Sequence, residues 1–289
     1  MSRSKTGTFR DLLLLNLGIL CISTSGILGR TIPITPFEII FWRSLIAFFC
    51  LAILVVVQKK NIFSLFQKAP LALLASGLLL GVHWITYFFA LQWSSIAIGM
   101  LSLYTFPIIT AFLEPLFGSD RFERKHIYLG LAMLLGIYLI SPEIDQTNQQ
   151  FLAVGMGIFS AFSFSFRNLL IKKITKNTDG QSIMTLQVGI VSLFLLPVSF
   201  HDAISVLEEN FSQLFFLALV TTVIGHSLFL QSFQKFSITT ASLISCLQPL
   251  YGIVMGAMLL NEIPSFKTAI GGLIILTAVG MEIYSVQKK

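Results

Sequence analysis

The sequence predicts an all-α membrane protein with ten transmembrane helices arranged as two inverted five-helix repeats. Three observations predict this fold class: a very apolar composition, ten hydrophobic segments, and a self-similarity at an offset of 142 residues. Of the 289 residues, 55% are hydrophobic and 11% are charged, whereas soluble domains carry about 25% charged residues. One soluble core cannot bury so much apolar surface, so the expected solvent for this chain is a lipid bilayer.

The ten hydrophobic segments are the expected membrane spans. A helix needs about 20 mostly apolar residues to cross the hydrocarbon core. The fifth segment is short, and the third and fourth are almost continuous. The segments are Leu12–Gly29, Phe37–Val57, Ala69–Leu91, Ser94–Phe117, Ile127–Ile140, Phe151–Ile171, Gln181–Phe200, Phe211–Phe233, Ser237–Leu260 and Ser265–Val286.

The basic residues fall on alternate loops. Fifteen of the 19 Lys and Arg residues lie in the two tails or in loops on the expected side of the N-terminus, and only Arg30 and Lys267 lie in opposite-side loops. Those opposite loops carry acids instead, such as Glu143 and Asp145. The positive-inside rule predicts that both termini are cytoplasmic in a multi-pass protein of the cytoplasmic (inner) membrane. This bias explains the net charge of +6 without a nucleic-acid partner.

The two halves of the chain, residues 1–143 and 150–289, match at an offset of 142. The matched pairs include prolines, glycines, acids and bases, which are not expected by chance in an apolar chain. The matched pairs are Gln92 with Gln234, Pro107 with Pro249, Gly130 with Gly272, Asp120 with Glu262, and Arg30 with Lys172. At the same offset, Trp84 occupies the position equivalent to His226. Because each half has an odd number of helices, the second half must enter the membrane inverted. Inverted repeats are typical of secondary transporters, although a duplication kept for packing would leave the same pattern.

Several short motifs recur in the two halves. The first half has Phe41-Trp42-Arg43-Ser44-Leu45, Ser94-Ser95-Ile96-Ala97, Pro107, Asp120, Gly130 and Gly136. The second half has Ser237-Ile238-Thr239-Thr240-Ala241, Gln248-Pro249, Asn261-Glu262 and Gly271-Gly272. In this order the chain resembles EamA-type members of the drug/metabolite transporter superfamily, with Asp120 where that family usually has Glu. The resemblance implies a ten-helix carrier for amino acids, other metabolites or drugs, often an exporter.

We therefore expect a secondary transporter that moves a small organic solute by alternating access, with export as the expected direction. A proton or a counter-transported solute is the candidate driving partner, since no nucleotide-binding motif occurs. No enzyme signature or metal-ligand cluster occurs either, so no cofactor is expected. The alternatives are a channel or a non-transporting scaffold, and a lipid-modifying enzyme, for which the sequence lacks an interfacial cluster of acids and histidines.

A central cavity is expected between the halves, lined mainly by the third, fourth, eighth and ninth segments. Residues that combine an aromatic or amide group with a mid-segment position are the candidate solute contacts: Trp84, Tyr87, Tyr104 and Gln248. Three further intramembrane polar residues are candidates for polar anchoring or coupling: His83, His226 and Arg43. His83 and Tyr87 are four residues apart and so share a helix face.

Pro107 and Pro249 lie inside the fourth and ninth segments, where a proline cannot donate its backbone hydrogen bond. Their matched positions predict kinks that shape or gate the cavity, and static kinking for packing is the simpler alternative. Arg43 must pair, face water or snorkel, and Glu38 is a candidate partner. Arg167 lies near the cytoplasmic end of its segment and is expected to snorkel.

Three acids near segment ends complete the set of charged candidates. Glu114 is expected either to pair with a basic loop residue or to bind a coupling proton. Asp120 and Glu262 occupy helix connections, where an acid can cap the N-terminus of the following helix.

Overall fold

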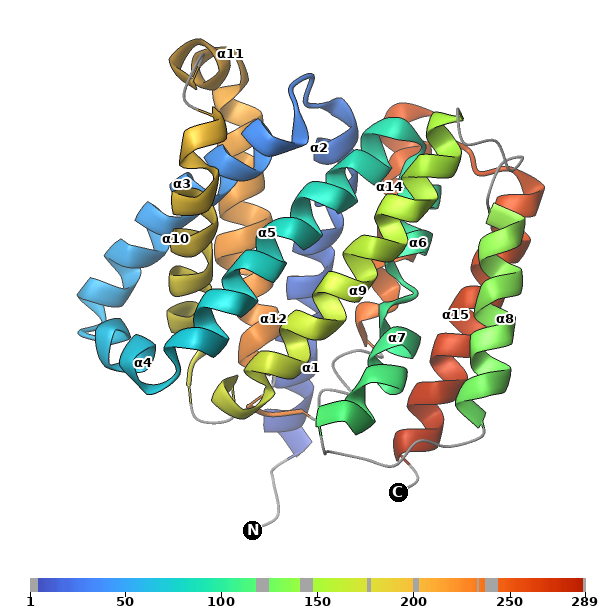
Figure 1. Ribbon diagram of the computed structural model, residues 1–289, viewed down its shortest axis with the longest axis horizontal. Helices are drawn as coiled ribbons and strands as arrows, with labels where there is room; N and C mark the ends of the chain where they lie inside the picture. The colour runs from blue at the N-terminus through green and yellow to red at the C-terminus, as the bar shows by residue number, and fades with distance from the viewer. Residues whose placement is uncertain are drawn as a thin grey trace.

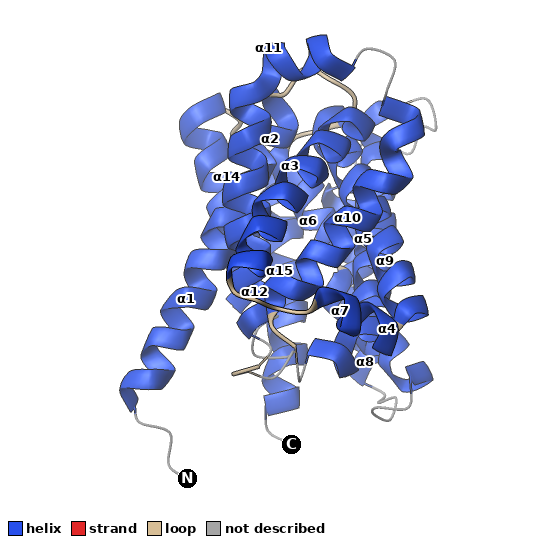
Figure 2. Ribbon diagram, turned by 90° about the vertical axis from the view of Figure 1, so that its left-hand side faces the viewer, coloured by secondary structure: helices blue, strands red, loops and turns tan. Residues whose placement is uncertain are grey.

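The computed structural model describes residues 5–117, 125–140, 148–175, 178–199, 203–232, 234–236 and 244–287. Within these ranges every regular element is a helix (Figures 1 and 2). The start of α1 and the end of α15 lie at the same end of the bundle, and α2 and α4 lie at opposite ends (Figures 1 and 2).

Figure 1 shows the helices of each half as a run of long rods joined by short pieces. In the first half they are α1 (Lys5–Ser23), α2 (Ser25–Thr31), α3 (Pro36–Val57), α4 (Ile62–Lys68), α5 (Pro70–Trp93), α6 (Ile96–Leu103), α7 (Phe106–Leu113), the 3₁₀ turn η1 (Glu114–Phe117) and α8 (Lys125–Ile140). In the second half they are α9 (Gln149–Thr175), α10 (Gly180–Ser199), α11 (Ala203–Phe216), the π-helix η2 (Leu217–His226), α12 (Ser227–Ser232), α14 (Leu247–Leu260) and α15 (Phe266–Gln287).

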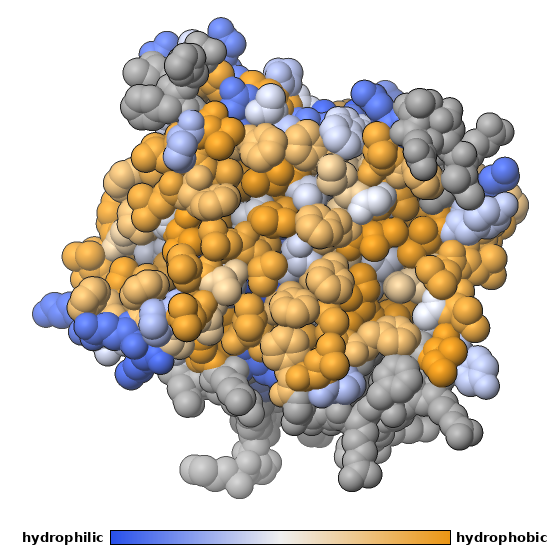
Figure 3. Space-filling model, viewed as in Figure 1, coloured by the Kyte–Doolittle hydropathy of each residue, from blue (hydrophilic) through white to orange (hydrophobic). Residues whose placement is uncertain are grey.

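Among the residues that the structure describes, six helices are long and apolar enough to cross a membrane. They are Arg10–Thr31, Pro36–Val57, Pro70–Trp93, Gln149–Lys172, Gly180–Val198 and Ser205–Ser232, and four shorter apolar helices accompany them: Ile96–Thr110, Ile127–Ile140, Leu247–Leu260 and Phe266–Met281. A broad apolar band covers the middle of the visible face in Figure 3, with hydrophilic residues toward its two ends. Val56, Leu71, Leu193 and Met258 are between 72% and 80% exposed. So large an apolar surface needs lipid to cover it, which confirms an all-helical membrane protein.

Helices of one half pack against helices of the other. α5 lies along α9, α3 along α10, and α8 along α15 (Figure 1). α3 and α10 occupy equivalent positions in the 142-residue repeat, and so do α8 and α15. The packing of α1 on η2 is the repeat equivalent of the packing of α9 on α5. Each half therefore completes the core of the other.

The helix starts follow local capping chemistry. The Thr35 side chain accepts a hydrogen bond from the Glu38 backbone, and the Glu38 carboxylate accepts one from the Thr35 backbone at 2.9 Å, which forms a capping box with Pro36 at the first turn. Asn61 caps α4 and Ser95 caps α6 through their side-chain oxygens. These caps satisfy backbone donors that the first helical turn leaves free.

The fourth predicted segment is not one helix. α6 ends at Leu103, and α7 begins at Phe106 after a turn at Tyr104 and Thr105. A turn at Cys246 precedes α14 at the equivalent repeat position. Pro107 and Pro249 therefore lie in the first turns of new helices and not in mid-helix as predicted, because a proline cannot donate to the carbonyl four residues earlier. Their matched role as helix breakers is a finding of the structure.

Three other boundaries differ from prediction. The first predicted segment divides at Thr24 into α1 and α2, with the Thr24 hydroxyl bonded to the Cys21 carbonyl at 2.7 Å. Short helices also occupy two expected loops, α4 and the first part of α11. Both contain helix-favouring residues. Packing of their apolar side chains stabilises these short helices, and the length of a loop does not predict such packing.

Gly136 and Gly271 allow the close approach of α8 and α15. A Cβ on Gly271 would lie 2.7 Å from the Gly136 carbonyl oxygen, and a Cβ on Gly136 would lie 2.9 Å from the Gly271 carbonyl oxygen. Small residues at helix contacts are a common packing device in membranes. Both clashes are with backbone, which cannot rotate away.

We predict that Gly271→Ala lowers the free energy of unfolding by about 1–3 kcal/mol, the usual cost of overpacking. Gly280→Ala is the matched control on the same helix, because a Cβ there meets nothing within 4 Å. Thermal unfolding of the two purified variants in detergent measures the difference. Equal melting temperatures would show that the α8–α15 contact is not close-packed.

Candidate functional site

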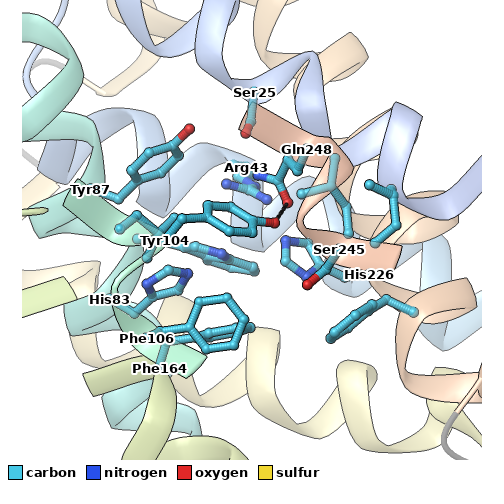
Figure 4. A pocket seen from close by; sticks show the side chains of 15 residues that line it. Ser25, Arg43, His83, Tyr87, Tyr104, Phe106, Phe164, His226, Ser245 and Gln248 are labelled. Carbon is cyan, nitrogen blue, oxygen red and sulfur yellow. Dashed lines mark hydrogen bonds between the residues drawn. The ribbon is translucent and has the colours of Figure 1, made fainter. Parts of the chain in front are cut away.

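A cavity lies between the two halves, and the close-up in Figure 4 shows its side chains converging from both. It contains ≈ 500 Å³ of space not occupied by atoms, including the part open to its surroundings, and it is narrow. The lining residues are Ile19, Ile22, Ser25, Arg43, His83, Trp84, Tyr87, Leu103, Tyr104, Phe106, Phe164, His226, Phe229, Ser245 and Gln248. A solute the size of an amino acid could enter only if these side chains moved apart.

The lining follows the internal repeat. Ten of its fifteen residues form five pairs separated by 142 positions: Ile22 with Phe164, Trp84 with His226, Tyr87 with Phe229, Leu103 with Ser245, and Phe106 with Gln248. The backbone positions are equivalent, but the side chains within each pair differ in chemistry. The cavity is therefore symmetric in its framework and asymmetric in its hydrogen-bonding groups.

Trp84 is the centre of a stack of three side chains. The Arg43 guanidinium lies 3.9 Å from the Trp84 ring centroid, and the His226 ring lies 5.3 Å from it at 57°. Trp84 and Arg43 are each 1% exposed. The stack joins α3 and α5 of the first half to η2 of the second, and its Trp84–His226 contact is between two repeat-equivalent residues.

Arg43 is held without an acid. Its Nε donates to the Thr222 hydroxyl at 2.8 Å, and Phe88 adds a second aromatic face 5.8 Å away. An arginine at mid-membrane costs about 2.5–3.5 kcal/mol on insertion scales. A desolvated cation–π contact contributes about 2 kcal/mol and a hydrogen bond from a charged group about 1.5–3 kcal/mol, which together offset that cost. The predicted pairing with Glu38 is wrong, because Glu38 is engaged in the capping box with Thr35.

The π-helix η2 carries Thr222 and His226 to the cavity. π-Helical turns are rare and occur frequently at functional sites. Thr221 and Thr222 are both fully buried in this segment. Thr221 bonds to the Leu217 carbonyl of its own helix at 2.6 Å, whereas Thr222 accepts from Arg43 across the interface between halves.

His83 is fixed by Ser160 on α9. The Ser160 hydroxyl donates to the His83 backbone carbonyl at 2.8 Å, and His83 Nδ1 lies 2.7 Å from the same hydroxyl oxygen. Because the hydroxyl hydrogen is already used, Nδ1 must be the donor, and a neutral imidazole then keeps Nε2 as an acceptor. The ring also stacks on Phe164 with a centroid separation of 4.5 Å.

Tyr104 and Gln248 meet across the cavity. The Tyr104 hydroxyl donates to Gln248 Oε1 at 3.0 Å, drawn as the dashed line in Figure 4. Tyr104 stands in the turn after α6, and Gln248 stands just after the turn at Cys246. The two helix breaks thus place both residues at the cavity.

The structure brings together all seven predicted contact and anchoring residues. Pro107 and Pro249 are not lining residues themselves, but each follows one, Phe106 and Gln248. Sequence reasoning missed the contributions of the first and sixth segments, namely Ile19, Ile22, Ser25 and Phe164, and also those of Leu103, Phe106 and Phe229. The repeat offset is a signal that could have found several of them, since Phe229 is the equivalent of Tyr87.

Arg167 does not snorkel as predicted. It is fully buried between α9 and α10. Its guanidinium donates to Asn168 Oδ1 at 2.9 Å and to Gln187 Oε1, and Gln187 in turn donates to the Ser76 hydroxyl at 2.9 Å. The side-chain oxygens of Asn168 and Gln187, the Met184 sulfur and the Phe164 ring therefore take the place of the solvent that the prediction required.

At the end of the bundle that contains α2, Arg30 and Glu262 join the two halves. Arg30 Nε lies 2.9 Å from Glu262 Oε1, and Arg30 Nη1 donates to the Gln92 carbonyl at 2.8 Å. Glu262 Oε2 accepts from the Ile96 backbone at 2.9 Å, at the start of α6. Glu262 therefore caps a helix of the other half and not the following helix, as the sequence predicted.

At the opposite end, Lys60 and Asp179 join the halves. Lys60 Nζ lies 2.8 Å from Asp179 Oδ1 and 3.0 Å from Gln181 Oε1. Asp179 also accepts from the Ser182 backbone and hydroxyl at the start of α10. Burial alone would raise the pKa of Asp179, but the hydrogen bonds from Lys60 and Ser182 outweigh it and hold this pKa below its ordinary value.

Glutamines at equivalent repeat positions bind backbone carbonyls at the two ends of the bundle. Gln92 Nε2 donates to the Ile34 carbonyl at 2.9 Å, and its repeat mate Gln234 donates to the Thr178 carbonyl at 3.0 Å. Asp120 and the Ser237–Ala241 motif lie outside the described residues, as do Glu143 and Asp145 and the side chain of Glu114. Their predicted roles stay predictions.

A family model covers both halves. The EamA-like transporter family matches residues 10–141 and again residues 151–283. The chain belongs to this family. Membership confirms the resemblance seen in the motifs and identifies the protein as a membrane transporter and not an enzyme.

Distant relatives in the EamA-like family handle different metabolites. The chain is 21% identical over 241 residues to the pseudopaline exporter CntI of Pseudomonas aeruginosa, covering 83% of this chain and 84% of that protein. It is 21% identical over 194 residues to a probable amino-acid metabolite efflux pump of Escherichia coli, covering 61% and 65%. It is 21% identical over 253 residues to an S-adenosylmethionine uptake transporter of Rickettsia conorii, covering 87% and 84%.

A solved crystal structure has the same fold. It superposes with a TM-score of 0.68 over 99% of both chains, at 15% sequence identity. At that identity the likeness extends to the fold alone.

The Thr222–Arg43 hydrogen bond yields a stability prediction. Thr222→Val leaves the Arg43 Nε buried without an acceptor, so we expect the free energy of unfolding to fall by about 1.5–3 kcal/mol. Thr221→Val is the matched control, since it is the adjacent, equally buried threonine and loses only contacts within its own helix, to the Leu217 carbonyl and to the Thr222 hydroxyl. Thermal unfolding in detergent compares them, and an equal effect of both changes would contradict the importance of the Arg43 contact.

Proposed function

We propose that this chain is a secondary carrier that moves a small organic solute across the cytoplasmic membrane by alternating access. The proposal includes ten membrane spans in two inverted five-helix halves, residues 1–143 and 150–289, with both termini in the cytoplasm. It also includes export as the direction, driven by a proton or a counter-transported solute.

The contact between Trp84 and His226 is the observation that carries this proposal. Residues related by a two-fold axis can touch only where both lie close to that axis. In an inverted repeat the axis lies in the membrane plane, near the bilayer midplane. A cavity whose lining forms five such pairs therefore suits a solute site that is reached alternately from the two sides.

The ion pairs at the two ends support a gating role. Arg30–Glu262 and Lys60–Asp179 each tie the first half to the second, at opposite ends of the bundle. By the distribution of basic residues, the Lys60 end is the cytoplasmic one. Opening one pair while the other stays closed would give the cavity access to one side at a time, with the helix breaks before Pro107 and Pro249 as the flexible points.

Within the cavity we propose two sets of roles. Trp84, Tyr87, Tyr104 and Gln248 contact the solute, because they combine flat apolar surface with hydrogen-bonding groups at its centre. His83, His226 and Arg43 provide polar anchoring or coupling. The relatives are a pseudopaline exporter, a probable amino-acid metabolite efflux pump and an S-adenosylmethionine uptake transporter, so amino acids, related metabolites and drugs are the solutes to test.

A channel or a non-transporting scaffold is the alternative. A channel gives flux that does not saturate and no counter-flow, and a scaffold gives no flux. Mass spectrometry of the medium of cells with and without the protein identifies the solute, and that solute is then tested in proteoliposomes. Saturation together with stimulation by the same solute on the opposite side supports the carrier, and flux without either property contradicts it.

The double substitution Trp84→Ala and Gln248→Ala tests the site. We expect at least a roughly tenfold loss of uptake of the identified solute, since each lost contact of about 1.4 kcal/mol weakens binding tenfold. Gel filtration shows whether the variant is folded. Undiminished uptake by a folded double variant would refute the proposed contacts.

The two ion pairs are predicted to control access from opposite sides. We expect Glu262→Gln to increase outside labelling of Ser25→Cys by an impermeant maleimide, in a background without the three native cysteines. A partly exposed pair contributes up to about 1 kcal/mol, or a roughly fivefold change. Asp179→Asn is the matched control and should increase labelling from the cytoplasmic side instead. Equal effects of both variants on one side would contradict alternate gating.

A further inference from the structure

Arg43 carries a hydrogen-bond donor that the protein leaves unused. Its Nη2 atom is buried and has no hydrogen-bond partner, and the same holds for Trp84 Nε1. Both residues line the cavity. Buried polar groups are nearly always paired, so two free donors beside one cavity indicate that a ligand supplies the acceptor.

The charge of the cavity is also unbalanced. Arginine stays protonated in proteins, and none of the fifteen lining residues is an aspartate or glutamate. Arg43 forms no ion pair with any residue that the structure describes. A cation in a medium of low dielectric constant strongly favours an anion that enters beside it.

Arg167 shows what a purely structural arginine looks like in this protein. It is equally buried and its Nε also has no hydrogen-bond partner, but both of its terminal nitrogens reach the side-chain carbonyl oxygens of Asn168 and Gln187. It also does not line the cavity. Arg43 has one hydroxyl and two aromatic faces instead, which hold the guanidinium in place while leaving an edge of it free.

The cavity has a polar end and an apolar end. In Figure 4, Arg43 lies toward Ser25 and Gln248, whereas Phe106 and Phe164 lie at the opposite end. The Tyr87 hydroxyl lies on the Ser25 side and interacts with the Ser25 hydroxyl, which adds polar groups to this end of the cavity. A ligand that fits this arrangement carries an anionic group at one end and a compact apolar body at the other.

We infer that Arg43, with the Trp84 N–H, binds the carboxylate of the transported solute. This assignment rests on the carrier function proposed above. It narrows the class of solute to organic anions and zwitterions that carry a carboxylate on an apolar body. A guanidinium presents several N–H donors in a plane and binds a carboxylate through two parallel hydrogen bonds. A solute that is only a cation is repelled from the same position.

Three probes of matched shape test the charge preference: 3-phenylpropionate, 3-phenylpropanol and 3-phenylpropylammonium. Each is titrated at millimolar concentration against the purified full-length protein in detergent, and thermal stabilisation reports binding. We expect the wild type to bind 3-phenylpropionate at least five times more tightly than the alcohol, and the ammonium compound more weakly than the alcohol. Equal binding of the three probes overturns the inference.

Four variants separate a carboxylate site from a structural clamp. Arg43→Gln should reduce the preference for 3-phenylpropionate to a ratio near one, Arg43→Lys should keep part of it, and Trp84→Phe should lower it a few-fold while keeping the ring. Arg167→Gln is the matched control, and we expect it to unfold more easily but to keep the wild-type ratio in the folded fraction. An unchanged ratio in a folded Arg43→Gln variant overturns the inference.

The inference and the carrier proposal can fail separately. Saturable, counter-flow-positive transport with no carboxylate among the exported solutes overturns the anion site alone. Charge-selective binding of 3-phenylpropionate without any transport supports the anion site and overturns the carrier function.

Discussion

The stack of Arg43, Trp84 and His226 is the interaction on which the rest of the site depends. It places a permanent positive charge inside a membrane protein and holds it with an aromatic face and one hydroxyl instead of an acid. Because its two rings come from equivalent positions of the two halves, the same contact marks where the halves meet. The positive charge of Arg43, the aromatic rings and the contact between repeat-equivalent residues therefore lie together at the centre of the cavity.

The bilayer explains why the irregular backbone lies where it does. Non-helical backbone at membrane depth is tolerated only where protein or a cavity satisfies its polar groups. The turn before Pro107 meets that condition, since the Thr105 hydroxyl donates to the Ser102 carbonyl at 2.8 Å and the Ser165 hydroxyl donates to the Phe106 carbonyl at 2.9 Å. At the two ends of the bundle, ion pairs join the halves, and the equivalent glutamines Gln92 and Gln234 bind backbone carbonyls.

Much of this arrangement could be predicted from residue patterns. Hydropathy located the long apolar helices, and the offset of 142 residues paired Trp84 with His226 before any contact was known. The partners of Arg43 and Arg167 could not be predicted, because they lie on distant helices: Thr222 is 179 residues from Arg43. The π-helix that positions Thr222 has no sequence signature, and the capping of α6 by Glu262 depends on tertiary approach.

The central claim is that the two ends of the bundle open in turn, on either side of the contact between Trp84 and His226. Spin labels at Thr31 and Ile263 report on one end of the bundle, and labels at Phe63 and Lys235 report on the other. Pulsed electron resonance of each pair in lipid nanodiscs gives the two distance distributions. The account predicts that conditions lengthening one distance shorten the other. Distances that change together, or a single fixed distance at each end under all conditions, would contradict it.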